Sequence, residues 1–234
     1  MSKKINKYLD TRYLGREILH FKQCDSTNRI AKELGKSHGA MIIADSQTAG
    51  RGRRGREWQS EKGGIYMSVI LSPEGKENIS EITLLCAVAL IRAIGTGGIK
   101  WPNDIVIDGK KVAGILCERT DDAVICGVGI NISNSLSPQL YATKLTGVNP
   151  TKLVAGFLNE LETILDKGFM SVHDEYLSHC INIDNEVMAI YENKTVTGTA
   201  IDVTPTGELV ISTADGDISV NSGEVSIRGV YGYI

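Results

Sequence analysis

The chain has 234 residues, 42% of them hydrophobic and 23% charged, and a formal net charge of -3 at pH 7. This length fits one large domain, alone or with a small appendage, and the composition is that of a globular protein. The slightly acidic balance argues against a dedicated nucleic-acid binder, which usually carries a basic excess. No apolar run approaches the roughly eighteen residues of a membrane span, and the N-terminus lacks a secretory signal. We therefore expect a cytoplasmic protein with no membrane partner.

The five cysteines, Cys24, Cys86, Cys117, Cys126 and Cys180, are widely scattered and include no Cys-x-x-Cys pair. The four histidines show no metal-ligand spacing alongside them. We interpret the cysteines as small buried hydrophobic residues in a reducing compartment, and we expect no structural zinc site.

Apolar spacing and turn residues predict a series of helices and strands. In chain order they are a helix over 26–37, strands over 41–44 and 64–71, a helix over 77–94, a hairpin of strands 105–107 and 112–117, a strand over 123–132, helices over 150–168 and 169–180, and short strands over 187–190, 195–201, 209–211 and 225–227. Ser26 or Thr27 can cap the first helix, and Asn149 precedes a proline at the start of the third.

The residue pattern changes near residue 184, where helical periodicity is replaced by short strand-like runs separated by turns. This change predicts two domains, 1–184 and 185–234, of which the second is a small barrel of roughly fifty residues.

Residues 50–56, with the sequence GRGRRGR, combine four arginines with three glycines. Glycine allows positive φ and a close approach of backbone N–H groups to a ligand, and guanidinium groups are forked donors. These groups suit a phosphate or a mixed anhydride of phosphate. A solvated basic turn, or a patch that grips nucleic-acid backbone, would have the same residues, so this segment alone leaves the alternatives open.

The same segment matches the dinucleotide-binding pattern Gly-x-Gly-x-x-Gly, but its context differs. That pattern requires a tight turn from a strand into a helix. Here five residues separate the preceding strand from the first glycine, arginine fills the three x positions, and a strand follows. A Rossmann site is therefore excluded, and a kinase loop is excluded because His-Arg-Asp and Asp-Phe-Gly do not occur.

A second segment has the sequence KWPND from Lys100, and the sequence KVAGIL follows from Lys111. The hairpin turn at 108–109 returns the chain, so we expect Lys111 to lie near Asn103 and Asp104. Lysine can neutralise a phosphoryl or carboxylate oxygen, and aspartate can hold Mg²⁺ or orient an incoming amine. Taken alone, Asn103 and Asp104 also suit an ordinary turn, and Lys111 an exposed strand position.

Together, GRGRRGR with Trp58 and KWPND with Lys111 resemble the signature motifs of the biotin protein ligase family. Weaker agreement comes from DSTN at 25–28, GVGIN at 127–131 and GEVSIRG at 223–229. The resemblance covers nearly the whole chain in the family's order. It implies an α/β (α+β) fold whose mixed sheet is like that of class II aminoacyl-tRNA synthetases and lipoate ligases, followed by a small SH3-like barrel.

The resemblance implies an ATP-dependent ligation in two steps. The carboxylate of biotin attacks the α-phosphate of ATP to give biotinyl-5′-AMP and pyrophosphate, and a lysine of a biotin carboxyl carrier domain then displaces AMP. ATP and biotin are the substrates, Mg²⁺ accompanies the nucleotide, and the family also implies a homodimer. Because only 24 residues precede Asp25, we expect neither a helix-turn-helix domain nor sequence-specific DNA binding.

The resemblance also assigns roles to individual residues. Lys111 and Arg53 would be catalytic, and Asp104 would hold Mg²⁺ or the acceptor lysine. The residues implied to bind biotin are Ser26, Thr27, Asn28, Gln47, Arg51, Gly52, Arg53 and Lys111, and those implied to bind ATP are Arg53, Arg56, Trp58, Asn103, Lys111 and Asn131. Both steps build negative charge on oxygen atoms, which suits these donors. We also expect the arginine-rich loop to close over the adenylate as a lid.

Two other functions fit parts of the sequence. A lipoate ligase or octanoyltransferase would share the fold and similar chemistry, but the Arg-Arg-x-x-Gly-Gly-Gly type of segment that those families carry is missing. A non-enzymatic polyanion-binding protein would use the arginine-rich loop without ATP turnover and would bind nucleic acid in a salt-dependent way. The acidic balance of the chain argues against this second function.

Overall fold

The structure is a computed structural model that describes residues 1–35, 37–71, 78–191, 194–222 and 226–229. Several elements predicted from the sequence include residues outside these ranges. Residue 36 of the first predicted helix, residue 77 of the second, and residues 223–225 of the last motif and strand lie outside the described residues.

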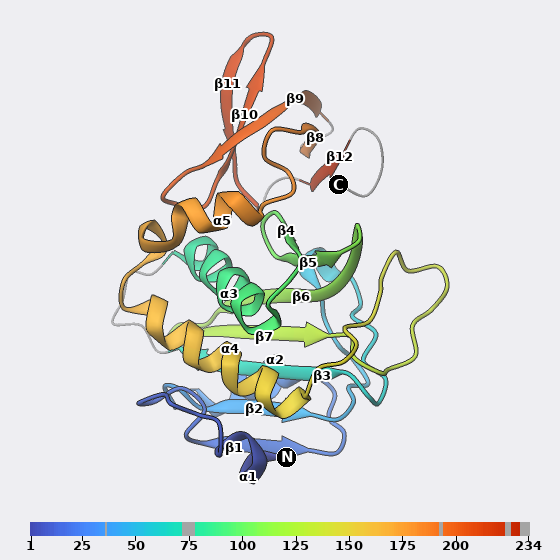
Figure 1. Cartoon of the computed structure of the whole chain (residues 1–234), viewed down its shortest axis with the longest axis vertical. Helices are drawn as coiled ribbons and strands as arrows, with labels where there is room; N and C mark the ends of the chain where they lie inside the picture. The colour runs from blue at the N-terminus through green and yellow to red at the C-terminus, as the bar shows by residue number, and fades with distance from the viewer. Residues whose placement is uncertain (36, 72–77, 192–193, 223–225, 230–234) are drawn as a thin grey trace.

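A seven-stranded mixed sheet forms the centre of the molecule, in the order β1-β2-β3-β7-β6-β5-β4 (Figure 1). Its strands are β1 (Ile18–Phe21), β2 (Met41–Ala44), β3 (Ile65–Leu71), β4 (Gly98–Lys100), β5 (Asp104–Ile107), β6 (Lys110–Arg119) and β7 (Val124–Ile130). Only β1 and β2 pair in parallel; the other neighbours are antiparallel. Sequence patterns missed β1 and β4, because both are short edge strands of mostly half-buried residues.

Helices cover both faces of this sheet. The helices α3 (Ile79–Ile94) and α4 (Pro150–Leu165) are stacked in layers on one face (Figure 1), and the short helix α2 (Thr27–Leu34) packs on the other. The remaining helical pieces are α1 (Ser2–Ile5), α5 (His173–His179) and the 3₁₀ turns η1 (Arg53–Gly55) and η2 (Phe169–Val172). Among the described residues, no helix is long and apolar enough to span a bilayer.

The two long helices begin and end where their local chemistry dictates. Asn149 accepts hydrogen bonds from the N–H groups of Thr151 and Lys152, so α4 starts at Pro150 as predicted. Asn78 caps α3 in the same way, and Gly95 ends it with φ of 80°. Because α3 lies between the sheet and α4, it is buried on nearly all sides.

A smaller antiparallel sheet follows in the C-terminal part of the chain. Its five strands are β8 (Glu186–Tyr191), β9 (Lys194–Val203), β10 (Leu209–Thr213), β11 (Gly216–Val220) and β12 (Ser226–Gly229), in the order β11-β10-β9-β8-β12. The fold class is therefore confirmed: a mixed α/β sheet with helices is followed by a small β module. We refer to strands β8–β12 as the C-terminal module.

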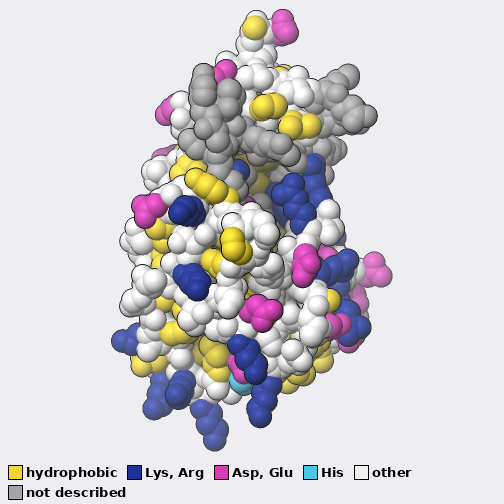
Figure 2. All heavy atoms as spheres, turned by 90° about the vertical axis from the view of Figure 1, so that its right-hand side faces the viewer, with side chains coloured by type: hydrophobic (Ala, Val, Ile, Leu, Met, Phe, Trp, Pro, Cys, Tyr) yellow, Lys and Arg dark blue, Asp and Glu magenta, His cyan; other side chains and the backbone are white. Residues whose placement is uncertain are grey.

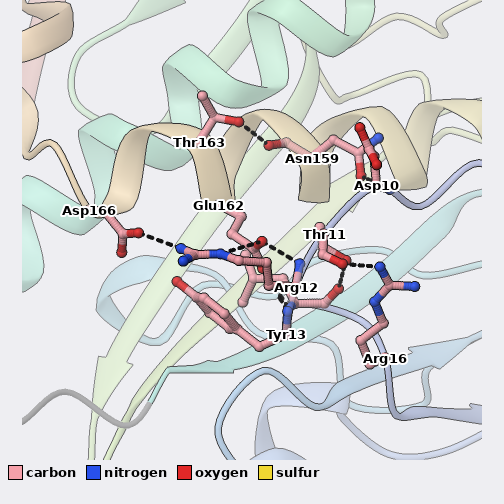
Figure 3. Close-up of polar contacts among 10 residues, drawn as sticks. Asp10, Thr11, Arg12, Tyr13, Arg16, Asn159, Glu162, Thr163 and Asp166 are labelled. Carbon is pink, nitrogen blue, oxygen red and sulfur yellow. Dashed lines mark hydrogen bonds and ion pairs between the residues drawn. The ribbon is translucent and has the colours of Figure 1, made fainter.

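Glu162 on α4 anchors the segment that leads from α1 to β1 (Figure 3). Its carboxylate accepts hydrogen bonds from the backbone N–H groups of Arg12, Tyr13 and Leu14 at 2.5, 3.0 and 2.9 Å. Burial raises the pKa of Glu162, but these three hydrogen bonds together outweigh burial and hold the pKa below its usual value. The charged carboxylate therefore stabilises the fold.

We expect Glu162→Gln to lower the free energy of unfolding at pH 7 by about 1–3 kcal/mol, because one charged acceptor for buried donors is lost. Since the folded pKa lies below the unfolded value of about 4.3, the contribution is present above that value and disappears as pH falls through the folded pKa. Urea denaturation at pH 7 and at low pH measures this difference. Asp166→Asn, which removes an exposed partner of Arg12, is the control and should cost little. Equal losses in both variants would contradict the role of Glu162.

Candidate functional site

A cavity of about 520 Å³ opens between the arginine-rich loop, the start of α2 and strands β6 and β7. The residues that the sequence assigned to the site all line it: Ser26, Thr27, Asn28, Gln47, Arg51, Gly52, Arg53, Arg56, Trp58, Asn103, Asp104, Lys111 and Asn131. Segments more than a hundred residues apart in the sequence therefore meet in one place.

The start of α2 is capped by a residue from outside the helix. The side chain of Ser26, which the sequence offered as a cap, makes no hydrogen bond to the first turn. Instead, the Oε1 atom of Gln47 accepts from the backbone N–H of Thr27 at 2.8 Å and from its hydroxyl at 3.1 Å. Gln47 in turn donates to Ser60. Gln47 therefore satisfies an N–H group that a helix start leaves unpaired, and Ser26 can line the cavity.

Asn28 fixes α2 against the sheet. Its Nδ2 atom donates to the carbonyl of Leu116 at 3.2 Å and to Glu118 at 2.8 Å. Its Oδ1 atom lies 2.6 Å from the hydroxyl of Ser68. A Cβ atom at Gly127 would lie 2.2 Å from this side-chain oxygen, so the strand can pass Asn28 only because residue 127 is glycine.

The arginine-rich loop is a tight, hydrogen-bonded turn. The N–H of Gly52 donates to the carbonyl of Arg56 at 2.7 Å, and Arg54 and Gly55 both have positive φ, 55° and 71°. A Cβ atom at Gly50 would meet the carbonyl oxygen of Trp58 at 2.4 Å. The glycines thus allow a turn compact enough to carry four guanidinium groups beside one cavity. A strand follows this turn, which differs from the Rossmann arrangement.

Arg53 connects the loop to two other parts of the molecule. One guanidinium nitrogen donates to Asn103 Oδ1 at 2.9 Å, and another donates to the backbone carbonyl of Ser222, next to the C-terminal module. Asn103 itself donates to the carbonyl of Ile115 at 2.8 Å. Burial lowers the pKa of Arg53, while the charge of Asp104 opposes this shift. Arg53 therefore presents a preorganised, partly desolvated positive charge.

Lys111 and Asp104 lie side by side, as the hairpin predicts. Lys111 Nζ forms an ion pair with Asp104 Oδ1 at 2.6 Å and lies 5.0 Å from the centre of the Trp58 ring. Within the described part of the chain, the indole N–H of Trp58 makes no hydrogen bond, although this atom is buried. A buried donor without a partner is costly, and a bound ligand can satisfy it.

Two glycines make room for Trp58 against the sheet. Gly114 on β6 and Gly129 on β7 are register partners. A Cβ atom would approach the indole within 2.9 Å at Gly114 and within 2.4 Å at Gly129. The indole can lie against these strands only because both positions lack a side chain. The GVGIN motif therefore has two roles: Gly129 leaves space for the indole, and Asn131 lines the cavity.

The cavity concentrates positive charge in a chain whose net charge is -3. Its cationic lining residues are Arg51, Arg53, Arg54, Arg56, Lys100 and Lys111, against the two carboxylates Glu57 and Asp104. In Figure 2, one group of Lys and Arg side chains lies directly below the C-terminal module, and others are spread over the same face. Such a lining attracts anionic ligands.

Sequence reasoning missed part of the lining. Leu116 from β6 and Tyr66 from β3 supply apolar wall, and the loop over 136–142 closes one side. The carbonyl of Tyr141 in this loop accepts from the N–H of Lys111 at 3.2 Å. One available signal was the pair Leu140 and Tyr141, two large apolar residues in a loop, which are 45% and 55% exposed.

Comparison with known families places this geometry in context. Residues 20–131 match the model of the Biotin/lipoate A/B protein ligase family, and residues 183–228 match the Biotin protein ligase C terminal domain. The first match contains both signature segments, and the second falls on the C-terminal module.

Named relatives and solved structures extend this similarity over nearly the whole chain. The bifunctional ligase/repressor BirA of Bacillus subtilis is 32% identical, over 94% of this chain and 76% of the relative. The biotin--[acetyl-CoA-carboxylase] ligase of Paracoccus denitrificans is 31% identical, over 82% of this chain and 96% of the relative. The biotin protein ligase of Aquifex aeolicus in complex with biotin and ATP has a TM-score of 0.83 and 29% identity, covering 92% of this chain and 99% of the other.

We expect Gly129→Ala to push the indole of Trp58 off the sheet, because the new methyl group would overlap it. Tryptophan emission should move to longer wavelength as the ring becomes hydrated, while Trp101 remains buried in the core. The matched control is Gly156→Ala on α4, where the nearest atom to a new Cβ is 3.6 Å away. An unchanged spectrum for Gly129→Ala would contradict the packing of Trp58.

Proposed function

Because the chain belongs to the biotin protein ligase family, we propose that it uses ATP to join biotin to a lysine of a biotin carboxyl carrier domain. The observation that carries this proposal is the meeting of Lys111 and Arg53 with the start of α2 around one positively lined cavity. A carboxylate and a triphosphate are both anionic, and their reaction concentrates negative charge at a single point.

The polar end of the cavity suits the head of biotin. Ser26 and Thr27 offer hydroxyl groups, and Leu116 and Tyr66 offer apolar wall. The ureido group of biotin has both donors and acceptors, while the rest of its bicyclic ring is apolar. Gln47 and Asn28 already hold α2 in place through their own hydrogen bonds, so we assign them mainly to fixing the shape of this end.

The first step forms the adenylate. A carboxylate oxygen of biotin attacks the α-phosphorus of ATP, and the bond from that phosphorus to the bridging oxygen of the β-phosphate breaks to release pyrophosphate. Lys111 and Arg53 would neutralise the oxygens on which charge accumulates. Two anions repel each other, so fixed cations also make the approach of the reactants possible.

The second step transfers biotin to the acceptor. The uncharged amine of the carrier lysine attacks the carbonyl carbon of the adenylate, the bond from that carbon to the phosphate oxygen breaks, and AMP leaves. The amine nitrogen loses a proton as the amide forms. Asp104 lines the cavity and would be one group able to orient the incoming ammonium or amine.

The residues present also fit the Mg²⁺ that accompanies ATP. Mg²⁺ takes hard oxygen ligands and binds through one or two carboxylates together with substrate phosphates. Asp104, whose carboxylate lines the cavity beside Lys111, is the carboxylate that would hold it. The ion would neutralise phosphate charge, alongside Lys111 and the arginines.

Further parts of the proposal rest on the family. We assign the ligase core to residues 1–184 and the C-terminal domain to 185–234, and we propose a homodimer in the cytoplasm. The five free cysteines are compatible with a reducing compartment. Arg53, which we assign to catalysis, donates a hydrogen bond to the backbone carbonyl of Ser222. This contact supports a role for the C-terminal module in completing the site.

Biotin-dependent ATP–pyrophosphate exchange tests the first step. We expect exchange with biotin and not with lipoate, and we expect Lys111→Ala to reduce it by about 100–1,000-fold, as the loss of one charge-stabilising donor does. Lys110→Ala removes the adjacent, exposed lysine of the same strand and should leave exchange nearly unchanged. Exchange with lipoate alone would move the chain to the lipoate ligases, and exchange with neither acid would contradict the proposal.

Asp104→Asn separates the two assignments of that residue. If Asp104 holds Mg²⁺, the variant should need more Mg²⁺ for pyrophosphate exchange. If Asp104 orients the acceptor, exchange should persist while single-turnover transfer from isolated biotinyl-5′-AMP to a carrier domain slows. Glu57→Gln, which removes the other carboxylate of the cavity lining, is the control. Wild-type rates in both assays would exclude a role for Asp104 in either step.

A further inference from the structure

Three cysteines converge on the side of the sheet that faces α3. Cys86 comes from α3, Cys117 from β6 and Cys126 from β7, and their sulfur atoms all lie within 4.8 Å of one another. Cys117 and Cys126 are also register partners across the two strands. Thiols from three separate elements therefore meet at one point, although they are far apart in the sequence.

The separations between the three sulfur atoms are compatible with one shared metal ion. Zinc binds thiolate sulfur at about 2.3 Å, so two sulfur ligands of one tetrahedral ion lie roughly 3.8 Å apart. Small rotations of side chains bring sulfur atoms from within 4.8 Å to that spacing. A disulfide would use only two of the three thiols, whereas a metal ion uses all of them.

A route to the cluster exists. A second cavity of about 170 Å³ is lined by Cys117 and by Thr83, which lies one turn before Cys86 on α3. Cys86 and Cys126 are buried, but Cys117 is only half-buried. The cavity leaves room for an entering ion and for water, which with three protein ligands would complete a four-coordinate ion.

The charges are also compatible. A divalent ion with three thiolates carries one net negative charge, and Arg53 lines the same small cavity. A metal requires the thiolate form of its cysteine ligands, so its binding would release the thiol protons.

Although their sequence spacing gave no reason to expect a zinc site, we propose that Cys86, Cys117 and Cys126 form a three-thiolate binding site for a soft d¹⁰ divalent cation such as Zn²⁺ or Cd²⁺. Thiolate ligands select such ions over Mg²⁺, which requires hard oxygen ligands. The site is separate from the Mg²⁺ that accompanies ATP, and it does not depend on the ligase activity proposed above. The site lies against strands β6 and β7, whose opposite face forms the wall beside Asn28 and Trp58.

Titration of the reduced, metal-free full chain with Cd²⁺ tests the site, because sulfur-to-cadmium charge-transfer absorption reports only on thiolate ligation. We expect one Cd²⁺ per chain. Cys117→Ser and Cys126→Ser should each weaken binding by at least about 100-fold, since even residues that only support a ligand cost 10–100-fold. Cys24→Ser, at a half-buried cysteine outside the cluster, should bind like the wild type. Absence of the absorption from the wild type, or its survival in both cluster variants, would overturn the proposal.

A second measurement needs no variant and covers the case in which a cluster variant fails to fold. The wild-type chain is alkylated with and without Cd²⁺, and the labelled cysteines are quantified by mass spectrometry. Cys117 and Cys24 are both half-buried, so both can react in the absence of metal. Cd²⁺ should slow the alkylation of Cys117 by at least about tenfold and leave Cys24 unchanged. Equal rates for Cys117 with and without Cd²⁺ would overturn the site.

Discussion

The candidate site depends on one steric constraint: three glycines remove side chains from one face of the paired strands β6 and β7. A Cβ atom at Gly114, Gly127 or Gly129 would lie within 3 Å of Trp58 or Asn28. With side chains at these positions, neither Trp58 nor Asn28 could lie against the backbone of β6 and β7, and the cavity would lose its present shape. Lys111 benefits as well, because its Cε atom would be 3.0 Å from a Cβ atom at Gly114.

Strand alternation divides the same two strands between different tasks. Successive side chains point to opposite faces, so Gly127 faces Asn28 while its neighbour Cys126 joins the thiols beside α3. The face toward the cavity is open and lined by cations, and the opposite face packs into the main hydrophobic core. A ligand bound on either face would therefore lie against the same two strands, β6 and β7.

Polar contacts over long sequence distances hold the cavity in shape. Gln47 caps α2 from 20 residues away, and Arg53 reaches the carbonyl of Ser222 at a separation of 169 residues. These contacts place cationic side chains at fixed positions before any ligand binds. Preorganised donors stabilise developing negative charge better than mobile ones, because little reorganisation is needed when charge forms. The fold thus concentrates positive charge that the chain as a whole does not carry.

The sequence alone determined the elements with strong local signals and the composition of the site. Strand β2 and the start of α4 follow from apolar runs and from the Asn149-Pro150 pair, and the two charged motifs identified Lys111 and Arg53 as candidates. Only the tertiary structure decided that Gln47 rather than the side chain of Ser26 caps α2, and that Cys86, Cys117 and Cys126 meet. The reason is physical: helix periodicity and turn chemistry act between near neighbours, whereas these contacts join distant segments that packing alone brings together.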